Sequence, residues 1–171
     1  MPPSTCSASG EDVKPTREEN SMNLTASDVM TKEVVACVRD TRVEEVVRTL
    51  AERGISGMPV IDVDEKVVGI ISESDLLLAD EGKPPLMKTA LFGLYILSQS
   101  VMEKAAEARG TLVRDIMTRP VVTLSRDATL SEVAHTMHDK KISRVPIVNA
   151  DGQLVGIVTR GDIIKALASE L

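Results

Sequence analysis

Apolar residues follow two spacings along this chain, and the same order of spacings occurs twice. A spacing of i, i+3, i+4 and i+7 is typical of an amphipathic helix, and short runs rich in β-branched residues are typical of strands. The helical spacing occurs at Val43, Val46, Val47 and Leu50 and again at Leu130, Val133, Ala134 and Met137. The strand-like runs are 34–38, 58–62, 67–72, 121–124, 145–149 and 154–159. With a last helix beginning near Asp75 and near Asp162, the predicted order is β-α-β-β-α, twice.

The two halves of the chain are copies of one another. Residues 28–78 align with 115–165 at a constant offset of 87, without a gap, and 18 of the 51 aligned positions are identical. Each copy is too small to bury all its apolar surface, so we expect the two to pack on each other around a pseudo-twofold axis. Two pairs have capping-box spacing at the start of the first helix of each copy, one position out of register: Thr41 with Glu44, and Thr129 with Glu132.

Two segments lie outside the repeat. Residues 1–22 are rich in Pro, Ser and Glu and lack the apolar run of a secretory signal, so we expect a disordered tail. Residues 81–111 form a linker with an apolar stripe at helical spacing. We expect a helix over about 86–108 that packs on its own module or on a second subunit. The two domains are then expected at 23–80 and 112–171.

Composition argues against several classes of function. The 171 residues carry a net charge of −6 and include one Phe, one Tyr and no Trp. Few aromatics argue against a stacking platform for nucleic acid, and the negative charge argues against binding to a phosphate backbone. No apolar stretch is long enough to span a membrane. Two cysteines without C-x-x-C spacing favour a reducing, cytoplasmic location.

Motifs of common enzyme classes do not occur in the sequence. Gly156–Gly161 has the glycine spacing of a Walker A motif, but Asp162 stands where lysine is required. Neither G-x-S-x-G nor H-E-x-x-H is present, so we expect no enzyme. His135 and His138 have i, i+3 spacing, which two surface histidines explain better than a metal pair. Cys37 is expected to be a small core residue.

The start of the last helix in each copy carries candidate ligand-binding groups. In the second copy Thr159 ends a predicted strand and Asp162 begins a predicted helix, which brings a hydroxyl, free backbone N–H groups and a carboxylate together. An anchored carboxylate suits the two hydroxyls of a ribose. The alternative is a helix N-cap that needs no ligand, and the residues alone leave both interpretations open.

Three motifs, each present twice, resemble those of the CBS (cystathionine-β-synthase) domain: D-[IV]-M-T, I-S-x-x-P-[VI] and G-I-[IV]-[ST]-x-x-D-[LI]. Their order is similar to that of a tandem CBS domain pair, or Bateman module, over about residues 24–168 of a stand-alone CBS protein. The resemblance implies an α/β (α+β) fold of two β-α-β-β-α domains with an inserted linker helix. It also implies a homodimer, clefts that bind AMP, ADP, ATP or S-adenosylmethionine, and regulation of an effector protein.

The resemblance assigns binding residues to both copies. The second-copy nucleotide site comprises Val121, Val122, Ser143, Arg144, Thr159, Arg160 and Asp162. The weaker first-copy site comprises Val34, Val35, Ser56, Ser72 and Asp75. Six basic and eleven acidic residues give a charge of −5 over 28–78, while seven basic and six acidic residues give +1 over 115–165. Gly57 and Glu73 replace the two arginines in the first copy, so we expect the phosphorylated ligand in the second.

Three functions remain open from the sequence. The first is a regulatory sensor that binds an adenine nucleotide, has no catalytic cofactor and modulates a partner protein. The second is a constitutive dimerisation or interaction module with degenerate ligand sites, which the apolar face at Leu86–Leu97 favours. The third is a metal- or redox-responsive protein that uses His135, His138 or Cys37.

Overall fold

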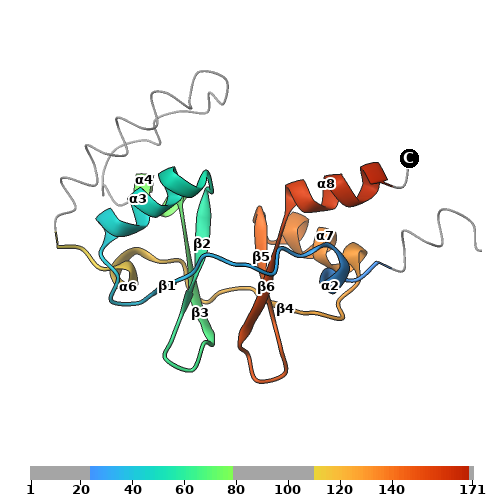
Figure 1. Ribbon diagram of the computed structural model, residues 1–171, viewed down its shortest axis with the longest axis horizontal. Helices are drawn as coiled ribbons and strands as arrows, with labels where there is room; N and C mark the ends of the chain where they lie inside the picture. The colour runs from blue at the N-terminus through green and yellow to red at the C-terminus, as the bar shows by residue number, and fades with distance from the viewer. Residues whose placement is uncertain (1–23, 79–109, 170–171) are drawn as a thin grey trace, which may run out of the picture.

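In the computed structural model, residues 24–78 and 110–169 form two halves of the same architecture, side by side (Figure 1). The first half contains α2 (Ala26–Val29), β1 (Cys37–Val38), α3 (Val43–Arg53), β2 (Gly57–Ile61), β3 (Val67–Ser72) and α4 (Glu73–Leu78). The second contains α6 (Val113–Ile116), β4 (Leu124–Ser125), α7 (Leu130–Asp139), β5 (Arg144–Val148), β6 (Leu154–Thr159) and α8 (Arg160–Ser169). The predicted α/β fold with two β-α-β-β-α repeats is confirmed. The predicted tail and the predicted insert helix at 86–108 fall outside the described residues.

Each half contains one three-stranded sheet, in the order β1-β2-β3 and β4-β5-β6. The first strand is parallel to the second, and the second is antiparallel to the third. The register is the same in both sheets, since Cys37 pairs with Val60 and the equivalent Leu124 pairs with Ile147. The strands predicted at 34–38 and 121–124 are shorter or shifted, since the paired strands comprise only Cys37–Val38 and Leu124–Ser125.

The short segment before each first strand crosses to the other half. We call residues 24–31 and 111–118 the exchanged arms. In the first arm the Thr31 N–H donates to the Ile157 carbonyl at 2.9 Å and the Ile157 N–H donates back at 3.0 Å. In the second, the Thr118 N–H donates to the Ile70 carbonyl at 2.9 Å, and the Ile70 N–H donates to the Thr118 carbonyl at 3.2 Å. Each half is therefore completed by a segment of the other.

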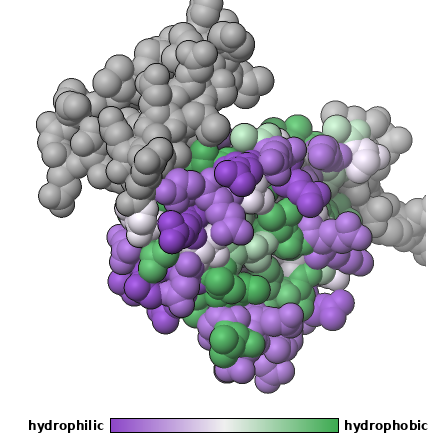
Figure 2. Space-filling model, turned by 60° about the vertical axis from the view of Figure 1, so that its left-hand side comes forward, coloured by the Kyte–Doolittle hydropathy of each residue, from purple (hydrophilic) through white to green (hydrophobic). Residues whose placement is uncertain are grey.

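Two apolar cores lie between sheets and helices, and the arms contribute to both. The first core contains the predicted helical stripe of α3, together with Val113 and Met117 from the second arm. The second contains Val133 and Met137 of α7, together with Ala26 from the first arm. The predicted stripe of α7 is correct except at Ala134, which is exposed. Hydrophilic residues cover much of the surface around an exposed apolar band (Figure 2).

The equivalent helices α3 and α7 begin differently. At α7 the Glu132 N–H donates to Thr129 Oγ1 at 3.2 Å, and the Thr129 N–H donates to Glu132 Oε2 at 2.8 Å, so this predicted capping box is confirmed. The predicted box at Thr41 is wrong, because α3 begins after Arg42 and no side chain caps it. The Thr41 hydroxyl instead accepts a hydrogen bond from the Val38 N–H at 3.2 Å.

Candidate functional site

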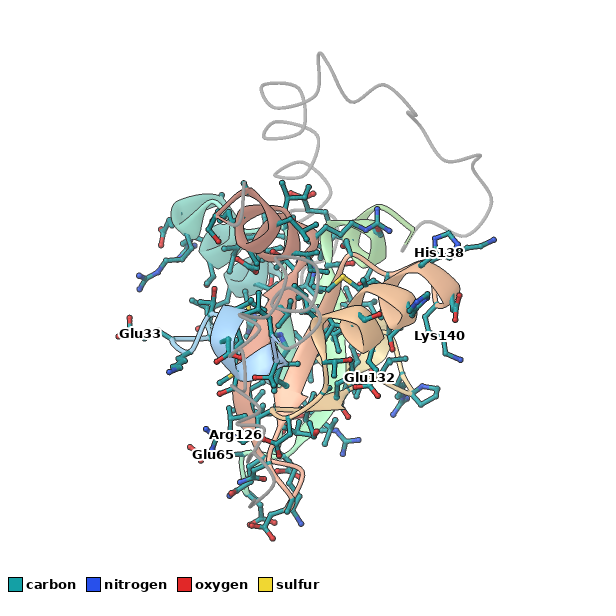
Figure 3. The ribbon with its side chains drawn as sticks, turned by 90° about the vertical axis from the view of Figure 1, so that its right-hand side faces the viewer. Glu33, Glu65, Arg126, Glu132, His138 and Lys140 are labelled. Atoms are coloured by element: carbon teal, nitrogen blue, oxygen red, sulfur yellow. The ribbon has the colours of Figure 1, made fainter. Side chains whose placement is uncertain are left out.

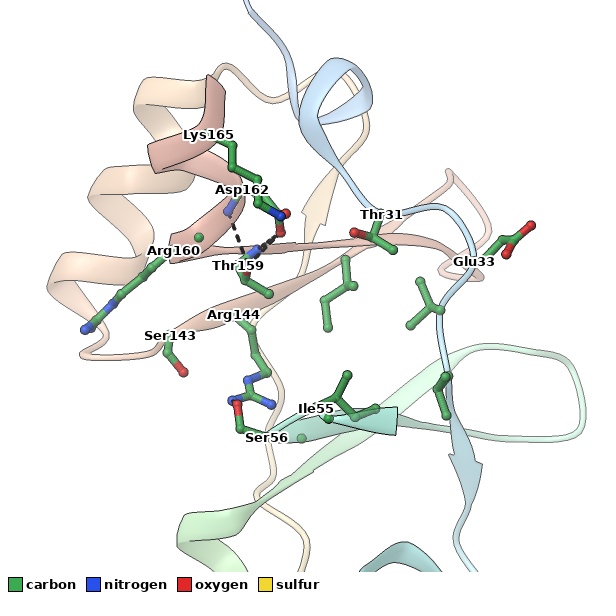
Figure 4. A pocket seen from close by; sticks show the side chains of 16 residues that line it. Thr31, Glu33, Ile55, Ser56, Ser143, Arg144, Thr159, Arg160, Asp162 and Lys165 are labelled. Carbon is green, nitrogen blue, oxygen red and sulfur yellow. Dashed lines mark hydrogen bonds between the residues drawn. The ribbon is translucent and has the colours of Figure 1, made fainter. Parts of the chain in front are cut away.

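A pocket of about 490 Å³ opens where the first arm meets the second half of the molecule (Figure 4). Both halves of the chain line it. The first half contributes Thr31 at the end of the arm, residues 33–35 after it, and Gly54–Gly57, which lead into β2. The second half contributes Ser143 and Arg144 at the start of β5, and residues at the start of α8. Its volume is within the usual range for small-molecule sites.

One end of the pocket is aliphatic. Val34, Val35 and the β6 residue Ile157 line the pocket, and Ile55, labelled in Figure 4, adds a fourth aliphatic side chain before β2. All four are partly buried, so they present apolar surface without being sealed inside the core. Among the residues lining this pocket there is no aromatic side chain, so a planar ring in this slot would be held by contact with aliphatic groups.

The other end is the junction between β6 and α8. The Thr159 N–H and hydroxyl both donate to Asp162 Oδ2, at 2.9 and 2.6 Å, and the Asp162 N–H donates to Thr159 Oγ1 at 3.3 Å. This is a capping box, with Thr159 before the first helical residue, Arg160. The prediction that α8 begins near Asp162 is therefore two residues late. Among residues 24–78 and 110–169, both bonds to the carboxylate end on Oδ2, which leaves Oδ1 there as an acceptor for a ligand.

Three cationic side chains border the polar end. Arg144 Nη2 donates to Ser56 Oγ at 2.6 Å, and Arg160 Nη2 donates to the Ile142 carbonyl at 3.2 Å. Lys165 lies one turn along α8 from Asp162. Burial lowers the pKa of the Arg144 guanidinium, an effect that nearby carboxylates partly offset. The positive charge expected beside the second-half helix start is therefore present on the pocket.

The structure regroups the predicted site residues. Ser143, Arg144, Thr159, Arg160 and Asp162 lie together on the pocket, as expected of one site. Val121 and Val122, assigned to the same site, do not line it, and their places are taken by Val34 and Val35, with Ser56. The cause is the exchanged arm, which carries the start of the first repeat onto the second. Eight further lining residues were not among those predicted from the sequence: Thr31, Glu33, Gly54, Ile55, Gly57, Ile157, Gly161 and Lys165.

The corresponding helix start of the first half is closed by its own hydrogen bonds. The Ser72 N–H and hydroxyl both donate to Asp75 Oδ2 at 2.7 Å, as at Asp162. In addition, the Thr118 hydroxyl donates to Asp75 Oδ1 at 2.6 Å, so both carboxylate oxygens have a partner. Thr31 is the equivalent of Thr118 and lies on the pocket beside Asp162, without such a bond among the described residues.

The candidate metal and thiol residues lie elsewhere. Burial, with a smaller effect of Glu45, raises the pKa of the Cys37 thiol to about 11, so the thiol stays protonated at neutral pH. His135 and His138 are exposed on α7, and Figure 3 shows His138 at the surface near Lys140. Within residues 24–78 and 110–169, no group of three or more His, Cys, Asp or Glu side chains is placed to hold a metal ion. None of the helices in these ranges has the length and apolar character needed to cross a membrane.

Known proteins share both the sequence pattern and the architecture. The CBS domain profile matches residues 26–82 and 113–169. Protein MJ1426 of Methanocaldococcus jannaschii is 38% identical over 82% of this chain and 89% of its own length. The chloroplastic CBS domain protein CBSX1 of Arabidopsis thaliana is 34% identical over 74% of this chain and 56% of its own length.

Two solved structures of similar architecture contain adenosine compounds. CBSX2 in complex with AMP is 27% identical, with a TM-score of 0.64 over 85% of this chain and 96% of the CBSX2 chain. The CBS domain pair of protein MJ0100, in complex with 5′-methylthioadenosine and S-adenosyl-L-methionine, is 25% identical, with a TM-score of 0.65. That match covers 86% of this chain and 98% of the MJ0100 chain.

Proposed function

Because this chain belongs to the CBS domain family and carries two such domains in tandem, we propose that it is a regulatory module that binds an adenine nucleotide. The observation that carries the proposal is the pocket at the start of α8, which has an aliphatic slot at one end and an anchored carboxylate with arginines at the other. Binding of AMP, methylthioadenosine and S-adenosylmethionine by related CBS pairs supports a ligand of this class.

Each part of a nucleotide has a matching group in the pocket. The adenine is proposed to lie between Val34, Val35 and Ile157, in the role first assigned to Val121 and Val122. Oδ1 of Asp162 accepts from the ribose hydroxyls. Phosphate oxygens accept from Arg144 and Arg160, with the Ser143 hydroxyl beside them. The cations favour AMP, ADP or ATP over an uncharged nucleoside.

The first-half cleft is proposed to be the weaker site. Ser72 and Thr118 already donate to both oxygens of Asp75, so a ribose there would have to displace the Thr118 hydroxyl. Glu73 stands where the second half has Arg160, and an acidic side chain opposes a phosphate. A single strong nucleotide site per chain follows from these contacts.

Ligand occupancy is proposed to act on a separate effector protein, through a homodimer in the cytoplasm. Helix α8 presents Ile164 and Leu167 to solvent with 66% and 50% of their surface exposed, and it begins at the pocket. Apolar side chains at this exposure suit an interface with a second copy. The same surface supports the alternative of a constitutive dimerisation module. The metal-responsive alternative has no comparable support among the described residues.

A thermal-shift panel tests the proposed ligand class. AMP, ADP, ATP, S-adenosylmethionine and NAD are each added at about 100 times the expected dissociation constant, where a specific ligand adds roughly 2.7 kcal/mol. For a chain of this size that raises the melting temperature by roughly 5–10 °C. Asp162→Ala is expected to abolish the shift and Asp75→Ala to keep it. A panel in which no compound raises the melting temperature would favour the constitutive module.

Light scattering tests the proposed dimer. Ile164→Glu with Leu167→Glu places two charges on the exposed face of α8 and is expected to lower the mass from that of a dimer to that of a monomer. Ser131→Glu, at an exposed position of α7, serves as the control for added charge. An unchanged mass in the double variant removes α8 from the interface.

A further inference from the structure

Arg144 reaches across the boundary between the two repeats. It begins β5 in the second half, but its Nη2 donates to Oγ of Ser56, in the first half, at 2.6 Å. Figure 4 shows the guanidinium beside Ser56 and directed away from Asp162. Its Nη1 occupies the space that a Cβ on Gly57 would need. Ser56 and Gly57 of the first half therefore provide the position that this side chain occupies, which we call the arginine seat.

The seat is also acidic. The carboxylates of Glu73 and Asp75, at the start of α4, act on the Arg144 guanidinium and raise its pKa against the lowering effect of burial. The half-buried guanidinium thus has a hydroxyl as hydrogen-bond partner and two first-half carboxylates as charge partners. These groups compete with any anion in the pocket, because they interact with the same side chain.

The planar geometry of arginine makes this competition one of direction. Its N–H donors lie in one plane, and a bidentate contact with phosphate uses two of them in parallel. The bond to Ser56 Oγ fixes the direction of Nη2 toward the first half. To present its fork to a phosphate beside Asp162, the guanidinium has to turn and release Ser56.

We propose that Arg144 is shared between the repeats, so that Ser56, Glu73 and Asp75 hold it on the first half until a phosphate group in the pocket takes it over. This inference rests on the proposed function and adds how the ligand is sensed. A phosphorylated ligand breaks the contact between Arg144 and Ser56, whereas an unphosphorylated adenosine leaves it in place. Ser56, although it lines the pocket, then opposes phosphate binding.

Calorimetric titration of the full chain with AMP and with adenosine tests the proposal. Ser56→Ala is expected to bind AMP about three- to tenfold more tightly, with adenosine affinity unchanged within about twofold, because one hydrogen bond to a charged group no longer competes. Arg144→Gln is expected to reduce AMP affinity toward that of adenosine. Ser131→Ala, at an exposed position of α7, controls for the substitution itself. Weaker or unchanged AMP binding by Ser56→Ala overturns the proposal.

Two further measurements separate this inference from the proposed function. Glu73→Gln, at an exposed position, removes a carboxylate from the seat and is also expected to tighten AMP binding. If the wild-type chain binds neither AMP nor adenosine, the proposed function fails, and inorganic pyrophosphate becomes the probe of Arg144. Tighter pyrophosphate binding by Ser56→Ala than by wild type then supports the shared arginine, and equal or absent binding overturns it.

Discussion

The two halves of this molecule have the same strand register and the same hydrogen bonds from a hydroxyl residue to the aspartate at the last helix start, yet their clefts differ. In the first half both oxygens of Asp75 accept hydrogen bonds within the protein, the second one from Thr118. In the second half the bonds to the Asp162 carboxylate from the described part of the chain end on one oxygen. A duplicated backbone therefore supplies two equivalent positions, and a few side-chain contacts decide which one is open to a ligand.

A second difference lies where the halves meet. Residues 57 and 144 are equivalent positions, and Arg144 fills the space that a side chain at Gly57 would need. A large side chain fits at one of these two positions only when the other position has no side chain. The absence of a side chain at position 57 thus makes room for the Arg144 guanidinium, and this pair of positions contributes to the charge difference between the clefts.

The largest expected effect is on ligand binding at the two aspartates. Asp162→Asn keeps the shape of the side chain but removes the charge that accepts the ribose hydroxyls, and we expect about a 10- to 100-fold loss of AMP affinity. Asp75→Asn is expected to bind AMP as tightly as wild type or more tightly, because Asp75 lies at the other helix start and its charge acts on Arg144 against a phosphate. Calorimetry measures both. Equal losses in the two variants would show that the clefts are not different.

The steric relation between positions 57 and 144 gives the next largest effect. Gly57→Ala is expected to lower the free energy of unfolding by about 1–3 kcal/mol, because the new Cβ meets Arg144 Nη1 and lies 2.7 Å from the Ile71 carbonyl oxygen. Adding Arg144→Ala removes the first contact and is expected to recover part of the loss. Urea unfolding of the single and double variants tests this. Additive effects of the two substitutions would contradict it.

The difference in capping between α3 and α7 predicts a smaller effect. Thr129→Ala removes the side-chain cap of α7 and is expected to cost about 1 kcal/mol of unfolding free energy. Arg42→Ala, at the N-cap of α3, is expected to cost less than about 0.5 kcal/mol, because no side chain caps that helix. Both are measured by urea unfolding. A larger loss at Arg42 than at Thr129 would reverse the comparison.

The smallest expected effect comes from the residues that follow α3 and α7. Gly54 and its equivalent Lys141 both have positive φ angles, of 62° and 55°, which glycine adopts without strain. Lys141→Gly is therefore expected to raise the free energy of unfolding by about 0.5 kcal/mol, while Gly54→Ala lowers it by about 0.5–1 kcal/mol. Thermal unfolding of both variants gives the two signs. A destabilised Lys141→Gly variant would show that the lysine side chain contributes more than its strain costs.

The fold was predictable because it depends on periodicities that the sequence displays directly. The apolar stripe of α3 and the pair Thr129 and Glu132 each have a fixed spacing in the sequence. In the structure the stripe lies in the first core, and Thr129 caps α7. The cap at Thr41 has the same spacing as Thr129 but no role at α3, because the Val38 N–H takes its hydroxyl. Spacing alone does not show which backbone group a hydroxyl will reach.

The composition of the pocket was only partly predictable. The helix-start pair Thr159 and Asp162 is local in sequence, so its geometry follows from a four-residue motif. Whether Val34 or Val121 lines the pocket depends on which half each arm packs against. Both arrangements fit the same pattern of apolar residues in the sequence. A signal for the arginine seat was present, since a glycine at position 57, at the start of a strand, is typical of close approach by another group.

A chain with one repeat would have no partner for its arm. The Thr31 N–H and carbonyl would lose Ile157, and Met30, which packs over Gly156, would lose its cover. Two such chains could satisfy each other by trading arms, which is domain swapping. Separately expressed halves are therefore expected to reassemble by complementation. Duplication and fusion of a swapped half-length ancestor would produce this chain without any new contact.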